Sequence, residues 1–141
     1  MTAVLIDPTT QGAVPENAVT FVDALPGLPA DVRHFHLEPL DTAGHLFALR
    51  STQTTTRLFL LQPGPYFADY VPAPSAEVMA TLGLDTDPDA TAFLVVVNPG
   101  DDVSAATANL VAPIILNTRT REAVQTVLDD AWPLRAPLAH P

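Results

Sequence analysis

The sequence contains no cysteine and no lysine, and these two absences exclude several kinds of chemistry. Without cysteine there is no disulfide bond, thiolate metal ligand or cysteine nucleophile, which fits a reducing compartment. Without lysine there is no phosphate-binding loop of the Walker type. The residues around Ser51, Ser75 and Ser104 do not form the Gly-x-Ser-x-Gly turn of a serine nucleophile. Because no recognisable catalytic set is present, we expect no enzymatic activity and no cofactor.

Positive charge is also scarce, since six arginines stand against sixteen aspartates and glutamates and give a formal net charge of −10. A contact with nucleic acid depends on clustered cations, so direct binding to RNA or DNA is disfavoured. The same charge favours solubility and long-range attraction to basic protein surfaces. Charge alone does not identify the partner.

Long hydrophobic runs are missing as well. The strongly apolar stretches Phe93–Val97 and Leu110–Leu116 are far shorter than the ~20 residues of a membrane span. The apolar run Met1–Ile6 has no basic residue before it and is too short for a signal peptide. We therefore predict a cytoplasmic protein. Its 141 residues suit one domain, and an apolar content of 48% can build a core.

The fifteen prolines leave little room for long helices, whereas short runs rich in β-branched and aromatic residues favour strands. The expected strands are Ala3–Ile6, Val19–Val22, Arg33–Leu37, His45–Arg50, Arg57–Leu61, Thr91–Val97, Val111–Leu116 and the candidate Ala123–Leu128. This spacing predicts a mainly β protein, a small antiparallel β-barrel-like domain with one short helix. Leu58–Leu61 and Phe93–Val97 are apolar on both faces, which predicts central strands covered on both sides or strands at the seam of a barrel.

The expected helix begins after Ser75, which can cap it, and carries Glu77 in its first turn, where the helix dipole favours an anion. Val78 and Leu82 share one face, and Gly83 ends the helix. We expect this helix to plug one end of the barrel.

Two segments near the C-terminus are less regular. Arg121–Leu128 fits either a helical stripe or a strand face, and its β-branched residues favour the strand. The Pro/Ala-rich segment Pro133–Pro141 is expected to be a partly loose tail.

One possible metal site lies on an expected strand, where His34, His36 and Glu38 alternate with Phe35 and Leu37. Residues two apart on a strand share a face, so two imidazoles and a carboxylate could hold one metal ion. A half-exposed strand produces the same alternation without any metal. We favour the exposed strand and expect no metal site.

A series of short motifs runs through the chain in a consistent order. The earlier ones are Val19-Thr20-Phe21, Leu25-Pro26-Gly27, His36-Leu37, Phe47 with Leu49-Arg50-Ser51, and Pro63 with Phe67 and Tyr70. The later ones are Leu82, the unbroken run Thr107-Ala108-Asn109-Leu110-Val111-Ala112-Pro113-Ile114-Ile115-Leu116-Asn117, and Gln125 with Leu128. This ordered set, from Val19 to Leu138, resembles the FliW family of flagellar assembly factors, whose TANLxAPIxxN motif the long run matches. Ala24, Leu28 and Arg50 depart from the family pattern, where glycine, phenylalanine and glutamine are usual.

The resemblance implies a compact β-barrel-like fold and a single FliW-like domain over residues 1–141. It also implies a non-enzymatic role. Proteins of this family bind flagellin, and when flagellin is scarce they bind the RNA-binding regulator CsrA and relieve its repression of flagellin translation. The acidic charge suits attraction to such a regulator.

The residues that match the family motifs are the candidate partner contacts: Phe67, Tyr70, Thr107, Asn109, Pro113 and Asn117. The two asparagines have a second interpretation, because asparagine is a turn former and they flank the expected strand Val111–Leu116. For Asn109 we favour the turn. The alternatives for function are a generic acidic interaction module with another partner and a metal-dependent enzyme using His34, His36 and Glu38.

Overall fold

The structure is a computed structural model that describes residues 18–99, 106–129 and 131–138. The expected strand Ala3–Ile6 lies outside these residues. The strands are β1 (Ala18–Phe21), β2 (His34–Pro39), β3 (Leu46–Ser51), β4 (Arg57–Leu61), β5 (Thr91–Asn98), β6 (Thr107–Ala108), β7 (Ile114–Asn117), β8 (Glu122–Gln125) and β9 (Ala136–Pro137). The helices are α1 (Ala76–Thr81) and the short 3-10 helix η1 (Pro88–Ala90).

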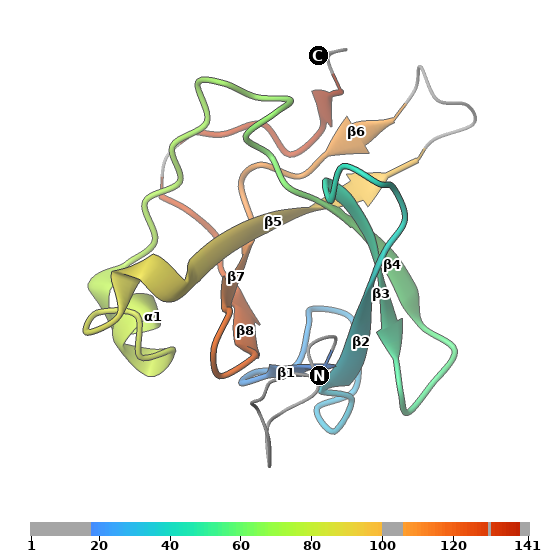
Figure 1. The fold of residues 1–141 in the computed structure, drawn as a ribbon, viewed down its shortest axis with the longest axis vertical. Coiled ribbons are helices and arrows are strands. Elements are labelled where there is room, and N and C mark those ends of the chain that lie inside the picture. Colours follow the sequence, from blue (N-terminus) through green and yellow to red (C-terminus); the bar gives the residue numbers. More distant parts are fainter. Residues whose placement is uncertain (1–17, 100–105, 130, 139–141) are drawn as a thin grey trace.

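Pairing between β4 and β5 closes seven of the strands into a barrel, in the order β4-β3-β2-β1-β8-β7-β5 (Figure 1). Neighbouring strands are antiparallel except β1 and β8, which run parallel. The predicted mainly β, barrel-like fold with one short helix is confirmed. The closing pair joins the two runs that are apolar on both faces, since Phe59 lies opposite Val97 and Leu61 opposite Val95. The sequence therefore indicated the seam of the barrel.

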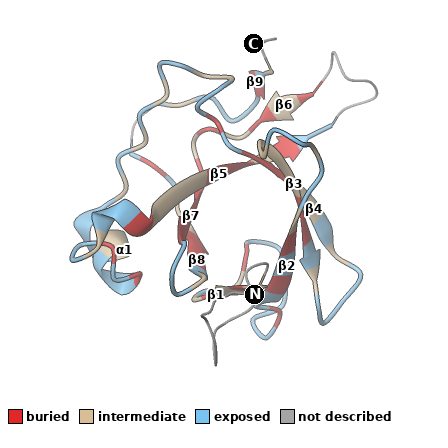
Figure 2. Ribbon diagram, in the orientation of Figure 1, coloured by how far each residue is buried: buried red, intermediate tan, exposed pale blue. Residues whose placement is uncertain are grey.

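Side chains fill the interior of the barrel because each strand alternates between an inward and an outward face. In β2, Phe35 and Leu37 are buried while His34 and His36 are exposed, as the alternation predicts. Phe35 packs edge-on against Phe21 with ring centroids 5.3 Å apart. Figure 2 shows the buried positions following the strands of the barrel, whereas the loops and α1 are largely exposed.

Helix α1 begins and ends close to the predicted positions. The Ser75 hydroxyl accepts a hydrogen bond from the backbone N–H of Val78 at 3.2 Å, which satisfies one free donor of the first turn. Gly83 follows the helix with a φ of +72°, a conformation that glycine adopts without steric cost.

The expectation that α1 plugs an end of the barrel is wrong, because α1 lies against the outer face of the barrel beside β7 (Figure 1). Ile114 and Leu116 of β7 point into the barrel, so Ile115 between them points outward. Val78 and Leu82 pack in one cluster with Ile115. The helix therefore gives β7 its second buried face.

Two strands that the sequence analysis missed, β6 and β9, cover another part of the outer face. Ala108 of β6 pairs with Ala136 of β9, and both pack in one cluster with Val95 and Val97 of β5. The segment Pro133–Pro141 was expected to be partly loose, but residues 136–137 of it are held in the sheet. Residues 139–141 lie outside the described part of the chain.

Candidate functional site

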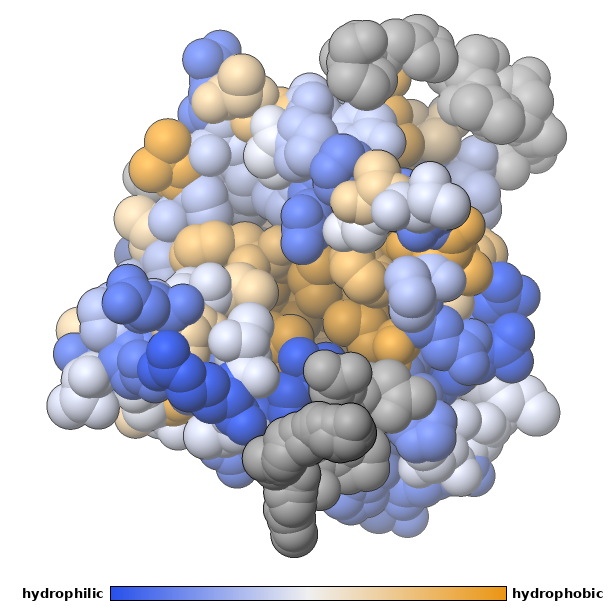
Figure 3. Space-filling view, viewed as in Figure 1, coloured by the Kyte–Doolittle hydropathy of each residue, from blue (hydrophilic) through white to orange (hydrophobic). Residues whose placement is uncertain are grey.

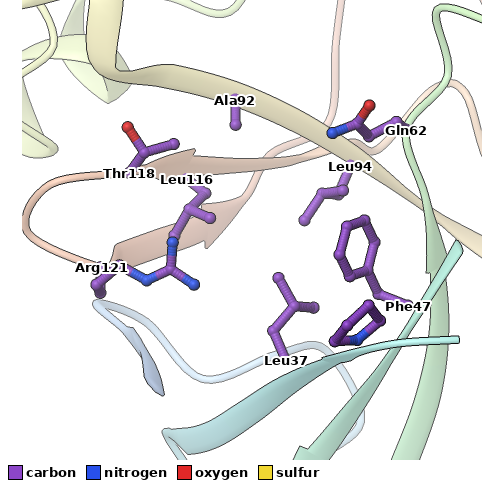
Figure 4. Close-up of a pocket in the computed structure, with 9 residues that line it drawn as sticks. Leu37, Phe47, Gln62, Ala92, Leu94, Leu116, Thr118 and Arg121 are labelled. Atoms are coloured by element: carbon purple, nitrogen blue, oxygen red, sulfur yellow. The ribbon is translucent and has the colours of Figure 1, made fainter. Parts of the chain in front are cut away.

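The mouth of the barrel forms a hollow of about 330 Å³ on the face shown in Figure 3, where apolar side chains gather at the hollowed centre. Residues from several strands and loops line it: Leu37, Pro39, Phe47, Gln62, Ala92, Leu94, Leu116, Thr118 and Arg121. Its floor is apolar and its rim carries an amide, a hydroxyl and a guanidinium (Figure 4). Beneath it the interior holds a space of only about 10 Å³, so side chains fill the barrel below this hollow.

Arg121 lies on the rim of this hollow in a strained backbone conformation, with a φ of +64°. A non-glycine residue there costs roughly 1–2 kcal/mol, which the surrounding contacts must offset. Its backbone N–H donates to the carbonyl oxygen of Asn117 at 2.8 Å, and its Nε donates to the carbonyl oxygen of Ala18 at 3.1 Å. Figure 4 shows its side chain extending from the rim toward Leu116. The hollow thus combines an apolar floor with one fixed cation.

A second hollow, also of about 330 Å³, lies between the loop after β4 and the segment before β9. We call it the aromatic groove, and its lining is Tyr66, Phe67, Ala68, Asp69, Tyr70, Leu110, Trp132, Pro133 and Ala136. The rings of Tyr70 and Trp132 meet edge-on with centroids 4.8 Å apart. Such pairs favour a fixed geometry, so the groove has a defined shape.

The Tyr70 hydroxyl is already occupied, since it donates a hydrogen bond of 2.7 Å to the carbonyl oxygen of Leu110. Burial raises the pKa of Tyr70 from 10.0 to about 12, because the phenolate would lose hydration. This bond ties the loop after β4 to the chain that enters β7.

The structure brings two of the predicted contact residues, Phe67 and Tyr70, together in the aromatic groove. Thr107 lies in β6, where it pairs with Pro137 of β9 next to the groove residue Ala136. These positions come from segments that are distant in the sequence. The groove is therefore the part of the described surface where predicted contacts meet.

Asn109 holds a turn with its side chain, as predicted. Its Oδ1 accepts hydrogen bonds from the backbone N–H groups of Val111 at 3.2 Å and Ala112 at 3.1 Å. Because this turn occupies residues that were expected to be strand, β7 begins at Ile114 and not at Val111. The favoured turn interpretation of Asn109 is confirmed.

Asn117 and Pro113 are also held inside the fold. Asn117 is only 3% exposed; its Nδ2 donates to the carbonyl oxygen of Leu82 at 2.8 Å. Its Oδ1 accepts from the backbone N–H groups of Arg119 at 2.9 Å and Thr120 at 3.1 Å. Pro113 is fully buried. Partner contact by these two residues stays a prediction, and the described geometry gives it no exposed side chain.

The strand face of His34, His36 and Glu38 is exposed, and its members have other neighbours. Glu38 Oε1 lies 2.9 Å from Arg50 Nε, and His34 Nδ1 lies 3.4 Å from Thr20 Oγ1. Within residues 18–99, 106–129 and 131–138, no three side chains of histidine, aspartate or glutamate converge as metal ligands. The described geometry therefore gives no support to the metal-dependent alternative.

Sequence reasoning missed the hollow at the barrel mouth. Gln62 stands in the loop after β4, whereas Thr118 and Arg121 stand in the turn between β7 and β8. They form no motif, so only the closed barrel brings them together. In the described part of the chain, no helix has the length and apolar character that a membrane crossing requires.

Comparison with known proteins adds independent observations. The family model described as FliW protein matches residues 8–138. A flagellar assembly factor FliW from Syntrophotalea carbinolica is 38% identical over 126 residues, which cover 88% of each chain. A flagellar assembly factor FliW 2 from Desulfotalea psychrophila is 33% identical over 126 residues, covering 88% of this chain and 82% of that relative. A crystal structure of the flagellar assembly factor FliW matches with a TM-score of 0.79 and 25% identity, over 88% of this chain and 86% of that one.

Proposed function

The chain belongs to the FliW family of flagellar assembly factors, and on that basis we propose that it is a non-enzymatic factor that binds flagellin and a CsrA-type regulator. The observation that carries the proposal is the family match over residues 8–138 together with relatives named flagellar assembly factors. When flagellin is scarce, the protein binds the regulator and relieves its repression of flagellin translation. When flagellin accumulates, it binds the protein and displaces it from the regulator. This exchange works in the cytoplasm, because flagellin is translated there.

The charge of the chain supports this choice of partner. A regulator that binds RNA must present arginine and lysine to phosphates, so its surface is cationic. A chain with a net charge of −10 and no lysine attracts such a surface from a distance and repels RNA. Binding to the regulator therefore does not require binding to its RNA.

The described hollows suit binding better than acid–base or nucleophilic chemistry. The aromatic groove is lined mainly by rings and small apolar residues, and its Tyr70 hydroxyl is held by the Leu110 carbonyl. Aromatic side chains at such places commonly anchor protein partners. The function then depends on the difference between the affinity for flagellin and the affinity for the regulator.

Calorimetry tests the proposal directly. Titrating the purified protein with the CsrA-type regulator of its host, and separately with flagellin, should give a saturable complex with each. Heat from neither partner at micromolar concentrations would contradict the proposal. A complex with an unrelated protein and with neither of these two would support the generic interaction module.

A further inference from the structure

Two strongly exposed apolar residues stand next to the groove's lining residues in the sequence. Within the described residues, the large apolar side chains that stand most exposed are Val127 at 74%, Val71 at 71%, Leu134 at 60% and Leu40 at 43%. Val71 directly follows Tyr70, and Leu134 follows Trp132 after one residue. Both exposed residues therefore stand close in the sequence to residues that line the groove. Exposed apolar surface around a hollow marks a binding site more often than isolated apolar residues do.

The groove also contains an unsatisfied hydrogen-bond donor. The indole Nε1–H of Trp132 is buried, yet it has no hydrogen-bond partner among the described residues. Buried donors in folded proteins are nearly always paired, because a donor that loses its water and gains no other acceptor costs free energy. Because this nitrogen has almost no accessible surface, a ligand in the groove could satisfy it only by displacing the indole ring.

The charge of the groove indicates which ligand chemistry fits. Asp69 contributes the one charged side chain of the described lining, and no arginine or histidine is part of it. The faces of the surrounding rings also attract cations. An arginine side chain matches both features, since its planar guanidinium stacks on aromatic rings and pairs with carboxylates.

We propose that the aromatic groove docks an arginine-bearing segment of the basic RNA-binding regulator. The guanidinium lies against the face of an aromatic ring of the groove and pairs with Asp69, and apolar neighbours in the segment cover Val71 and Leu134. The proposal rests on the proposed function, because that function supplies a cationic partner. It adds the surface and the kind of side chain that the surface recognises.

The test uses the intact protein, titrated by calorimetry with the CsrA-type regulator of its host. Asp69→Asn removes the carboxylate's charge at constant size, and Leu134→Ser removes an exposed apolar contact. Asp23→Asn and Val127→Ser are matched controls, since Asp23 is exposed and neither residue lines the groove. We expect Asp69→Asn to weaken the complex about tenfold and Leu134→Ser about threefold. The control variants should bind like the wild type.

Fluorescence gives a second readout, because Trp132 is the chain's single tryptophan. Its emission, corrected for the regulator alone, should shift on binding, and Asp69→Asn should require about tenfold more regulator for the same shift. Wild-type affinity in both groove variants would overturn this inference while leaving the proposed function intact. Failure of the wild type to bind the regulator would instead count against the proposed function. Groove variants that only dissolve a self-dimer in sedimentation would assign the groove to a second copy and overturn the inference.

Discussion

Asn109 precedes β7 and Asn117 is its last residue, and each stabilises a turn with its side chain. In the sequence alone, a turn asparagine and a contact asparagine look alike, so the motif by itself left the choice open. The structure distinguishes them through the backbone N–H groups that each Oδ1 accepts from. These turn hydrogen bonds give both asparagines a structural role, and partner contact at these positions stays a prediction.

Replacing Asn109 with alanine should lower the free energy of unfolding by roughly 0.5–2 kcal/mol, because the N–H groups of Val111 and Ala112 lose their acceptor. Asn109→Asp is the matched control, since aspartate keeps an acceptor oxygen at the same place. Urea unfolding followed by circular dichroism measures both. An alanine variant as stable as the wild type would show that the turn does not depend on this side chain.

The phenol of Tyr70 should ionise with a pKa of about 12, because burial disfavours the phenolate. The folded-state pKa lies above the unfolded value of 10.0, so the folded state holds the phenol proton more tightly than the unfolded chain does. The contribution of Tyr70 to the free energy of unfolding is therefore complete below pH ~10 and is lost as pH rises toward 12. The chain has two tyrosines, so Tyr66→Phe leaves Tyr70 as the only one that can titrate. Ultraviolet absorbance of the tyrosinate measures its pKa. A midpoint near 10 in the folded variant would contradict the burial of Tyr70 in the groove.

At the scale of elements, the sequence predicted strands with a strong side-chain pattern and missed the weak ones. Arg57–Leu61 is strand as predicted, and the ambiguous segment contains β8 at Glu122–Gln125. Strands β6 and β9 have two residues each, too few for any periodicity to show. The place of α1 was not predictable either, because it depends on which residues of β7 face outward, and this is fixed only once the barrel closes.

Leu82 anchors the end of α1 on the outer face of the barrel and is 1% exposed. Leu82→Ala should therefore lower the free energy of unfolding by about 2–5 kcal/mol, through lost burial and the cavity left behind. Val127→Ala is the control, because Val127 is 74% exposed and should change stability by less than about 0.5 kcal/mol. Chemical denaturation measures the free energy of unfolding of both variants. A cost for Leu82→Ala as small as that of the control would mean that the helix contributes little to the fold.

At the scale of the whole molecule, composition and pattern predicted an acidic β-barrel-like domain, and the apolar runs of β4 and β5 indicated where it closes. The parallel pairing of β1 with β8 was not predicted, because strands so far apart in the chain meet only through the complete topology. For the same reason the two hollows were missed. Their linings combine loops that no local signal connects.

The central claim is that this protein changes partners, and a translation assay tests it most directly. The assay contains a reporter behind a flagellin leader, the CsrA-type regulator and this protein. The regulator alone should repress the reporter, and adding this protein should restore translation. Flagellin added in excess should then bring repression back, because it removes this protein from the regulator. Translation that stays high at excess flagellin would contradict the partner switch.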